Sequence, residues 1–195
     1  YSLSENLSKW GYANTFVCNH KPAELKALAG QVDVLLVDAP CSGKGMFRKD
    51  PPARNEWSAT NAQICVNRQQ DILADVWPLI KEGGYLIYST CTFNPAENEQ
   101  QLMKLLSQHE AKVHRLPYFE GLSIDRAELG YYFLPNQVKS EGFYISALQK
   151  SAGKTHKSKP SKNSLQCVLP PELNEHLELF QALHFWQKDE QIHAS

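Results

Sequence analysis

Two cysteine residues of this chain lie in short segments where a thiol could do chemistry. Cys41 lies in the segment DAPCSG (38–43), and Cys91 lies in the segment TCT (90–92). Each segment directly follows an apolar stretch typical of a buried strand. A single free cysteine is usually a small buried hydrophobe. Two cysteines on converging loops, one beside an aspartate and the other before a helix, instead favour nucleophilic chemistry by a thiolate.

Cys91 also precedes a predicted helix start. In the segment NPAE, Asn94 suits the N-cap, Pro95 the first helical position and Glu97 the third, as in a capping box. The unpaired N–H groups of a helix N-terminus favour a thiolate over a thiol. An ordinary cysteine, with a pKa of about 8.5, is mostly protonated at neutral pH. This position therefore predicts an activated thiol.

The elements around both cysteines predict a parallel α/β sheet. Apolar strands are expected over 32–37 and 85–89, joined by a helix from Ser58 to about residue 80. A strand, crossover helix and strand form a right-handed unit, so both following loops emerge at the same carboxyl edge. Open α/β sheets bind ligands at that edge. We therefore expect Cys41 and Cys91 to face one bound molecule.

The remaining pattern divides the chain into three parts. Residues 1–149 are predicted to be part of a catalytic domain, 150–163 a basic linker, and 164–195 a helical appendage that can lead into a further domain. Further elements are expected as helices over 3–10, 22–28, 94–108 and 171–186, and as strands over 15–18, 111–116, 131–134 and 142–148, the last two antiparallel.

Composition excludes several classes of protein. A chain of 195 residues that is 42% hydrophobic buries a real core, which excludes disorder throughout. The net charge is -1, but the charges are unevenly distributed, because residues 150–163 contain five lysines and no acidic residue. We interpret this segment as a flexible linker in preference to a segment that contacts RNA phosphates. Five cysteines without a leader segment indicate a cytoplasmic protein, and no apolar run approaches the roughly 18 residues of a membrane span. The histidines show no zinc-site spacing, so no metal is expected.

Two longer segments closely resemble signature motifs of one enzyme family. The segments DAPCSGKGMFRKDP (38–51) and YSTCTFNPAENE (88–99) resemble those of the Nop/Sun family of S-adenosylmethionine-dependent RNA cytosine-C5 methyltransferases. A weaker resemblance extends over about 5–150, includes the segment EGF (141–143), and is best with bacterial ribosomal-RNA members. The resemblance implies the C-terminal portion of a Rossmann-like methyltransferase sheet, with S-adenosylmethionine as cofactor.

The resemblance also implies roles for three residues. Cys91 is the nucleophile that adds to carbon 6 of the cytosine, which makes carbon 5 reactive towards the methyl donor. Asp38 lies beside the methyl donor and the cytosine, where it can hydrogen-bond or protonate the ring nitrogen. Cys41 assists loss of the carbon-5 proton and release of the enzyme, and whether it is itself the base stays open.

Positive charges beside Cys41 suggest contact with RNA. Lys44, Arg48 and Lys49 suit phosphates, with ribosomal RNA favoured over transfer RNA as the substrate. The segment GKG (43–45) lacks the first glycine and the following Ser or Thr of a phosphate-binding loop, which excludes nucleotide hydrolysis. Trp57 and Phe93 are assigned to the core rather than to base stacking.

Other features of the family are missing from this sequence. It has neither the glycine-rich cofactor loop nor the acidic residue that binds the donor's ribose, and it reads NHK (19–21) where relatives often carry an aspartate. Only Asp38 remains as a family cofactor contact. We therefore expect a portion of a longer protein, with an open apolar sheet edge. A non-catalytic RNA-binding or ribosome-assembly module is the main alternative, and a thiol–disulfide enzyme is disfavoured because there is no C-x-x-C pair.

Overall fold

Strands of both directions form the main sheet of this chain. The computed structural model describes residues 2–11, 15, 17–115, 125–151, 185–188 and 191–194. These residues divide into a unit of residues 21–158 and a smaller unit drawn from residues 1–20 and 159–195. All the predicted site residues lie in the larger unit, so the fold of that unit positions the site.

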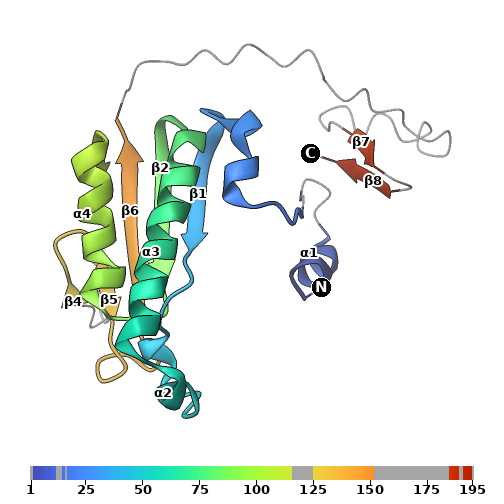
Figure 1. The fold of residues 1–195 in the computed structure, drawn as a ribbon. Coiled ribbons are helices and arrows are strands. Elements are labelled where there is room, and N and C mark those ends of the chain that lie inside the picture. The colour runs from blue at the N-terminus through green and yellow to red at the C-terminus, as the bar shows by residue number, and fades with distance from the viewer. Residues whose placement is uncertain are drawn as a thin grey trace. The chain divides into compact units, whose positions relative to one another are not determined.

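The sheet of the larger unit has a parallel pair at one side (Figure 1). The strands β1 (Val32–Asp38) and β2 (Ile80–Thr90) run parallel, and β6 (Phe143–Lys150) pairs antiparallel with β2. The described order is β1-β2-β6-β5-β4, and β3 also pairs with β6. The shorter strands are β3 (Ala111–Val113), β4 (Asp125–Arg126) and β5 (Tyr131–Phe133). The predicted parallel pair and the antiparallel final pair are confirmed.

Two helices cover one face of this sheet (Figure 1): α3 (Ala59–Val76) and α4 (Glu99–Gln108). Ser58 caps α3 as predicted, because its Oγ accepts a hydrogen bond from the backbone N–H of Asn61 (3.0 Å). The α-helix ends at Val76, and a 3-10 turn that contains Pro78 follows it. Proline has no backbone N–H to donate, so the α-helical hydrogen bonding stops there. The short helices are η1 (Pro22–Glu24), η2 (Lys26–Leu28), η3 (Lys44–Met46), α2 (Ala53–Glu56), η4 (Trp77–Leu79) and η5 (Pro95–Glu97).

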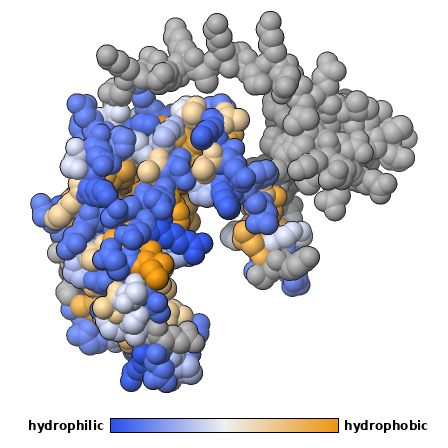
Figure 2. Space-filling view, in the orientation of Figure 1, coloured by the Kyte–Doolittle hydropathy of each residue, from blue (hydrophilic) through white to orange (hydrophobic). Residues whose placement is uncertain are grey.

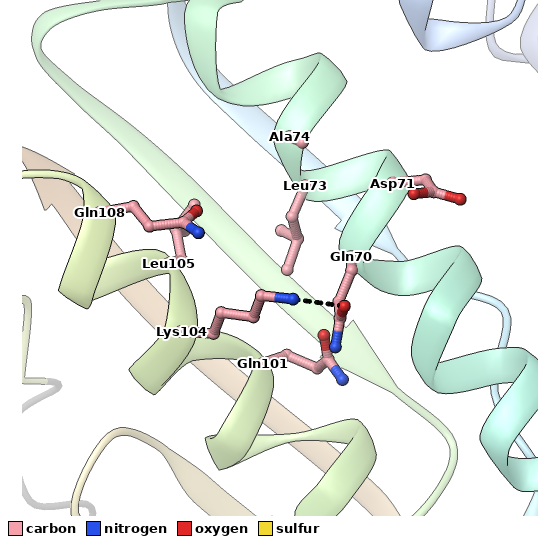
Figure 3. Close-up of a pocket in the computed structure, with 8 residues that line it drawn as sticks. All are labelled: Gln70, Asp71, Leu73, Ala74, Gln101, Lys104, Leu105 and Gln108. Carbon is pink, nitrogen blue, oxygen red and sulfur yellow. Dashed lines mark hydrogen bonds between the residues drawn. The ribbon is translucent and has the colours of Figure 1, made fainter.

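The core lies between the helices and the sheet. Leu73 of α3 and Leu105 of α4 are almost fully buried, and they belong to the same apolar cluster as Leu86 of β2. At the outer side of the helix pair, Lys104 donates a hydrogen bond to Gln70 (2.5 Å; Figure 3). The surface in view in Figure 2 is mostly hydrophilic over the helices, with apolar side chains in smaller groups between them. This layering holds the strand ends, and with them the site, in fixed register.

The opposite face of the sheet carries exposed apolar side chains. Val34 and Leu36 of β1 are 55% and 65% exposed, and β1 is the outermost strand of the described sheet. Leu36 lies opposite Ile87 of β2, which lies opposite Ala147 of β6, so the apolar surface continues across three strands. The predicted open apolar edge is thus present, and it extends onto the face beside it.

Some of the predicted elements differ in the structure. The helix expected over 22–28 is two 3-10 turns, and the described residues of 15–18 form no strand, because no neighbouring strand pairs with their backbone groups. Lys150, assigned to the linker, is the last residue of β6, and its ammonium donates to the carbonyl oxygens of Trp77 (3.2 Å) and Ile80 (2.8 Å). Burial lowers the pKa of Lys150. The linker residues 152–163 lie outside the described part of the chain.

The described residues of the smaller unit form one helix and a strand pair. The predicted N-terminal helix is confirmed as α1 (Ser2–Trp10), followed by Gly11 with φ of 79°. The strands β7 (Phe185–Lys188) and β8 (Gln191–Ala194) pair antiparallel. The helix predicted over 171–186 is wrong for residues 185 and 186, which begin β7, and residues 171–184 lie outside the described part of the chain. No helix among the described residues is long and apolar enough to cross a membrane.

Candidate active site

The two cysteines singled out by the sequence meet at the carboxyl edge of the parallel pair. β1 and β2 are in register up to Asp38 opposite Ser89, and the N–H of Ala39 donates to the carbonyl oxygen of Ser89 (2.9 Å). The loops that follow bring the Sγ atoms of Cys41 and Cys91 to 3.1 Å, and both residues are half-buried. The predicted convergence of the two thiols is confirmed.

The two thiols differ in acidity. The hydrogen bond from Cys41 lowers the pKa of Cys91 to about 7, with help from its own backbone N–H and against the opposing effects of burial and of the Asp38 and Glu97 charges. The same hydrogen bond, together with burial, raises the pKa of Cys41. Cys91 is therefore the more acidic of the two thiols, and near neutral pH the thiolate forms on Cys91 with Cys41 as its hydrogen-bond donor.

The cause of this activation differs from the predicted one. Residues 95–97 form the 3-10 turn η5, and the α-helix α4 begins only at Glu99. Asn98 separates η5 from α4, because its backbone angles (φ of -120° and ψ of -96°) are not helical. The N-terminus of an α-helix thus does not begin beside Cys91, and the neighbouring Cys41 takes over the role that the helix was expected to play.

The predicted capping box is half correct. The side chain of Asn94 does accept a hydrogen bond from the N–H of Ala96 (3.3 Å). The Glu97 carboxylate, however, is fully buried and accepts three hydrogen bonds. Two come from Ser42, through its backbone N–H (2.6 Å) and its Oγ hydroxyl (2.6 Å), and the third comes from Asn94 Nδ2 (2.8 Å). Glu97 therefore joins the loop after β2 to the loop after β1.

A backbone contact between two glycines joins these loops to the start of β6. The N–H of Gly45 donates to the carbonyl oxygen of Cys91 (2.9 Å), and the N–H of Gly142 donates to that of Gly45 (3.0 Å). A Cβ atom at Gly45 would lie 2.1 Å from the oxygen of Gly142, so no side chain fits there. The sequence pattern showed both glycines but not their contact, because residues 45 and 142 are remote in the chain.

A cavity of about 330 Å³ adjoins Cys91. Mostly apolar residues line it: Met46, Cys91, Phe133, Ser140, Glu141, Gly142 and Phe143. Among the described residues, no hydrogen-bond partner meets the buried Oε2 atom of Glu141, whereas its Oε1 atom lies 3.6 Å from the guanidinium of Arg48. The Cys91 thiol thus adjoins a space whose lining is mostly apolar.

The three basic residues near Cys41 have different surroundings. The Lys44 ammonium lies 4.5 Å from the centre of the Trp57 ring, and Arg48 donates to the carbonyl oxygens of Pro135 (3.3 Å) and Ser140 (2.5 Å). Lys49 is exposed. Arg48 therefore holds the segment before β6, and the predicted contacts of all three residues with RNA stay a prediction.

The aromatic assignments are only partly correct. Trp57 is half-buried, but Phe93 is 37% exposed and packs beside Gly142 at the rim of the site, so its assignment to the core is wrong.

Asp38 is exposed, and its Oδ1 atom accepts a hydrogen bond from Ser89 Oγ (3.1 Å). Within the described ranges, no group of three or more His, Cys, Asp or Glu residues could hold a metal ion.

Comparison with solved structures identifies the class of fold. The chain is similar to NSun6 from Pyrococcus horikoshii, solved with SFG (TM-score 0.63, 24% identity, 77% of this chain and 38% of that one). It is also similar to a methyltransferase homolog from the same organism (TM-score 0.64, 23% identity, 76% and 49%). The chain therefore shares the fold of these two proteins, and the predicted α/β class is confirmed.

Sequence comparison identifies the family. The chain belongs to the family described as 16S rRNA methyltransferase RsmB/F, whose model matches residues 1–149. Relatives named ribosomal RNA small subunit methyltransferase F include that of Erwinia tasmaniensis (36% identity, 77% of this chain and 32% of the relative) and that of Cronobacter sakazakii (30% identity, 97% and 43%). The chain thus spans less than half the length of these curated relatives.

Proposed function

We propose that this chain carries the substrate side of an enzyme that methylates carbon 5 of a cytosine in RNA, with ribosomal RNA as the substrate and S-adenosylmethionine as the methyl donor. One observation carries the proposal: the Sγ atoms of Cys41 and Cys91 lie 3.1 Å apart, with unequal acidity, at the carboxyl edge of the sheet. Membership in a family of ribosomal-RNA methyltransferases supports it. The free state of the four described cysteines supports a cytoplasmic enzyme.

The two thiols divide the chemistry between them. The Cys91 thiolate adds to carbon 6 of the cytosine, forming an S–C bond and pushing the ring's double-bond electrons towards carbon 5. After carbon 5 has gained a methyl group, it must lose its proton to a base, either Cys41 in its deprotonated form or a water molecule. The electrons of that C–H bond then restore the ring double bond as the S–C bond breaks. Cys41, next to the departing sulfur, is the group that assists this release.

The cavity beside Cys91 supports binding of a single base. A cytosine must leave its stack to reach a thiol on a protein loop, at a cost of a few kcal/mol that falls if the base is already unpaired. The apolar wall that includes Phe133 and Phe143 suits the faces of the ring. Lys44 and Lys49 then suit the adjoining phosphates.

The residues present fit part of a site for S-adenosylmethionine. The exposed Asp38 carboxylate stands at the end of β1, held on one oxygen by Ser89, and a carboxylate there suits the cationic groups of this cofactor. When bound, the cofactor supplies an electrophilic methyl group. Asp38 also lies close enough for its charge to act on Cys91, so one residue borders both halves of the reaction.

Covalent trapping tests the proposal. The complete gene product and its Cys41→Ser and Cys91→Ser variants are incubated with ribosomal RNA and the methyl donor, and denaturing gels reveal protein–RNA adducts. We expect adducts to accumulate for Cys41→Ser, because addition proceeds without release, and to be absent for Cys91→Ser. The reverse pattern would exchange the two roles. Absence of an adduct in every variant, together with unmethylated RNA, would favour a non-catalytic RNA-binding module.

A further inference from the structure

The buried carboxylate of Glu97 has no cationic partner among the ion pairs of the described residues. It is fully buried, and its hydrogen bonds come only from neutral groups, two from Ser42 and one from Asn94. A buried charge is costly unless donors compensate for it. The donors here belong to the two loops that carry the thiols, since Ser42 follows Cys41 and Asn94 lies three residues after Cys91.

The contacts of Glu97 bear more strongly on one thiol than on the other. Both carboxylate oxygens bind Ser42, the residue next to Cys41, and Ser42 Oγ also lies 3.3 Å from Thr92 Oγ1. Cys91 is held independently of Glu97, because it follows β2 directly and Asn98 binds both of its neighbours, Thr90 (2.6 Å) and Thr92 (3.0 Å). Loss of the Glu97 carboxylate would therefore free the Cys41 loop and leave Cys91 in place.

We propose that Glu97 is a positioning residue, which fixes Ser42 and through it holds the Cys41 thiol at the distance from Cys91 that release of the methylated base requires. The inference rests on the proposed function and adds to it the residue that sets the geometry of one step. Because a misplacement of about 1 Å can slow a reaction about 100-fold, a loosened Cys41 would impair release severely.

The first experiment separates addition from release in the complete gene product. Glu97→Ala removes all three hydrogen bonds, whereas Ser42→Ala removes only the hydroxyl donor and keeps the backbone N–H. Glu97→Gln keeps an acceptor for that N–H. The exposed Glu82 on the distant end of β2 gives a matched control, Glu82→Ala. Single-turnover reactions on ribosomal RNA measure adduct formation and adduct decay.

We expect Glu97→Ala to form the adduct at most about fourfold more slowly at pH 7, because a loosened Cys41 activates Cys91 less, and to release it about 100-fold more slowly. Ser42→Ala should slow release less, Glu97→Gln should restore part of it, and Glu82→Ala should change neither step. A purely structural role would lower both steps together. Equal loss of addition and release in Glu97→Ala, with normal release in Ser42→Ala, would overturn the proposal.

The second experiment needs neither RNA nor the methyl donor. The oxidant diamide joins two neighbouring thiols into a disulfide while it is itself reduced, and peptide mapping follows the link between Cys41 and Cys91. We expect slower linking in Glu97→Ala and Ser42→Ala than in Glu82→Ala, in folded protein verified by circular dichroism. An unchanged rate of disulfide formation in Glu97→Ala would overturn the positioning role of Glu97, whether or not methylation is observed. The positioning role and the proposed methyltransferase function can therefore fail separately.

Discussion

Replacing Cys41 by alanine tests whether the neighbouring thiol is what activates Cys91. In the unaltered protein the pKa of Cys91 is about 7, so about half of it is thiolate at pH 7. Without the hydrogen bond from Cys41, the pKa should rise towards the ordinary value of about 8.5, and the thiolate fraction at pH 7 should fall to about 3%. The more basic thiolate is intrinsically about four- to sixfold more nucleophilic.

These two effects oppose each other, and their balance depends on pH. At pH 7 the loss of thiolate prevails, and Cys41→Ala should react about three- to fourfold more slowly at Cys91 than the unaltered protein. At pH 10 both proteins are fully ionised at this site, and the variant should react about four- to sixfold faster. The two rate profiles must therefore cross between these pH values.

Alkylation by iodoacetamide, followed by mass mapping of the peptide that contains Cys91, measures both profiles. Cys18 is exposed and remote in sequence from the site, so Cys18→Ala serves as the control and should leave the Cys91 profile unchanged. Superimposable profiles for Cys41→Ala and the unaltered protein would refute the reasoning. A midpoint that stays near pH 7 in the variant would assign the activation to the backbone instead.

Two further predictions concern the supports of the site, each with a control variant. Gly45→Ala should cost about 1–3 kcal/mol in thermal unfolding and abolish adduct formation. Gly30→Ala, which is strained by its φ of 68° but has no neighbouring atoms within 4 Å, should retain adduct formation, and an active Gly45→Ala variant would contradict the close contact. Gln69, fully buried, donates to the carbonyl oxygen of Pro40 (2.9 Å), so Gln69→Ala should lower the free energy of unfolding in urea by about 1–3 kcal/mol. The neighbouring Gln70→Ala should change that free energy by less than about 0.5 kcal/mol, and equal effects of the two would count against the assigned contact.

The elements that follow from local pattern were predictable. The apolar stretches of β1 and β2, the cap at Ser58 and the handedness of the crossover together placed Cys41 and Cys91 at one edge of the sheet. Each of these features depends on a few neighbouring residues or on a general rule of chain geometry. The convergence of the two thiols was therefore a consequence of topology.

The contacts between remote loops were not predictable. The sequence assigned Glu97 to a capping box because its spacing from Asn94 fits one, but spacing says nothing of Ser42, which lies 55 residues away. The contact of Gly45 with Gly142 was hidden for the same reason. Arg48 has the charge of a phosphate ligand, yet two backbone carbonyl groups bind it, and only tertiary structure decides between these uses.

The exposed face of β1 bears on how this chain behaves in a test tube. Val34 and Leu36 continue an apolar surface across β2 and β6, and helices normally cover both faces of a sheet with parallel strands. Contiguous apolar patches are rare on proteins that stay monomeric. Purified by itself, this chain should therefore bind hydrophobic dyes and form larger particles in light scattering as its concentration rises, and polar substitutions at Val34 and Leu36 should improve its solubility.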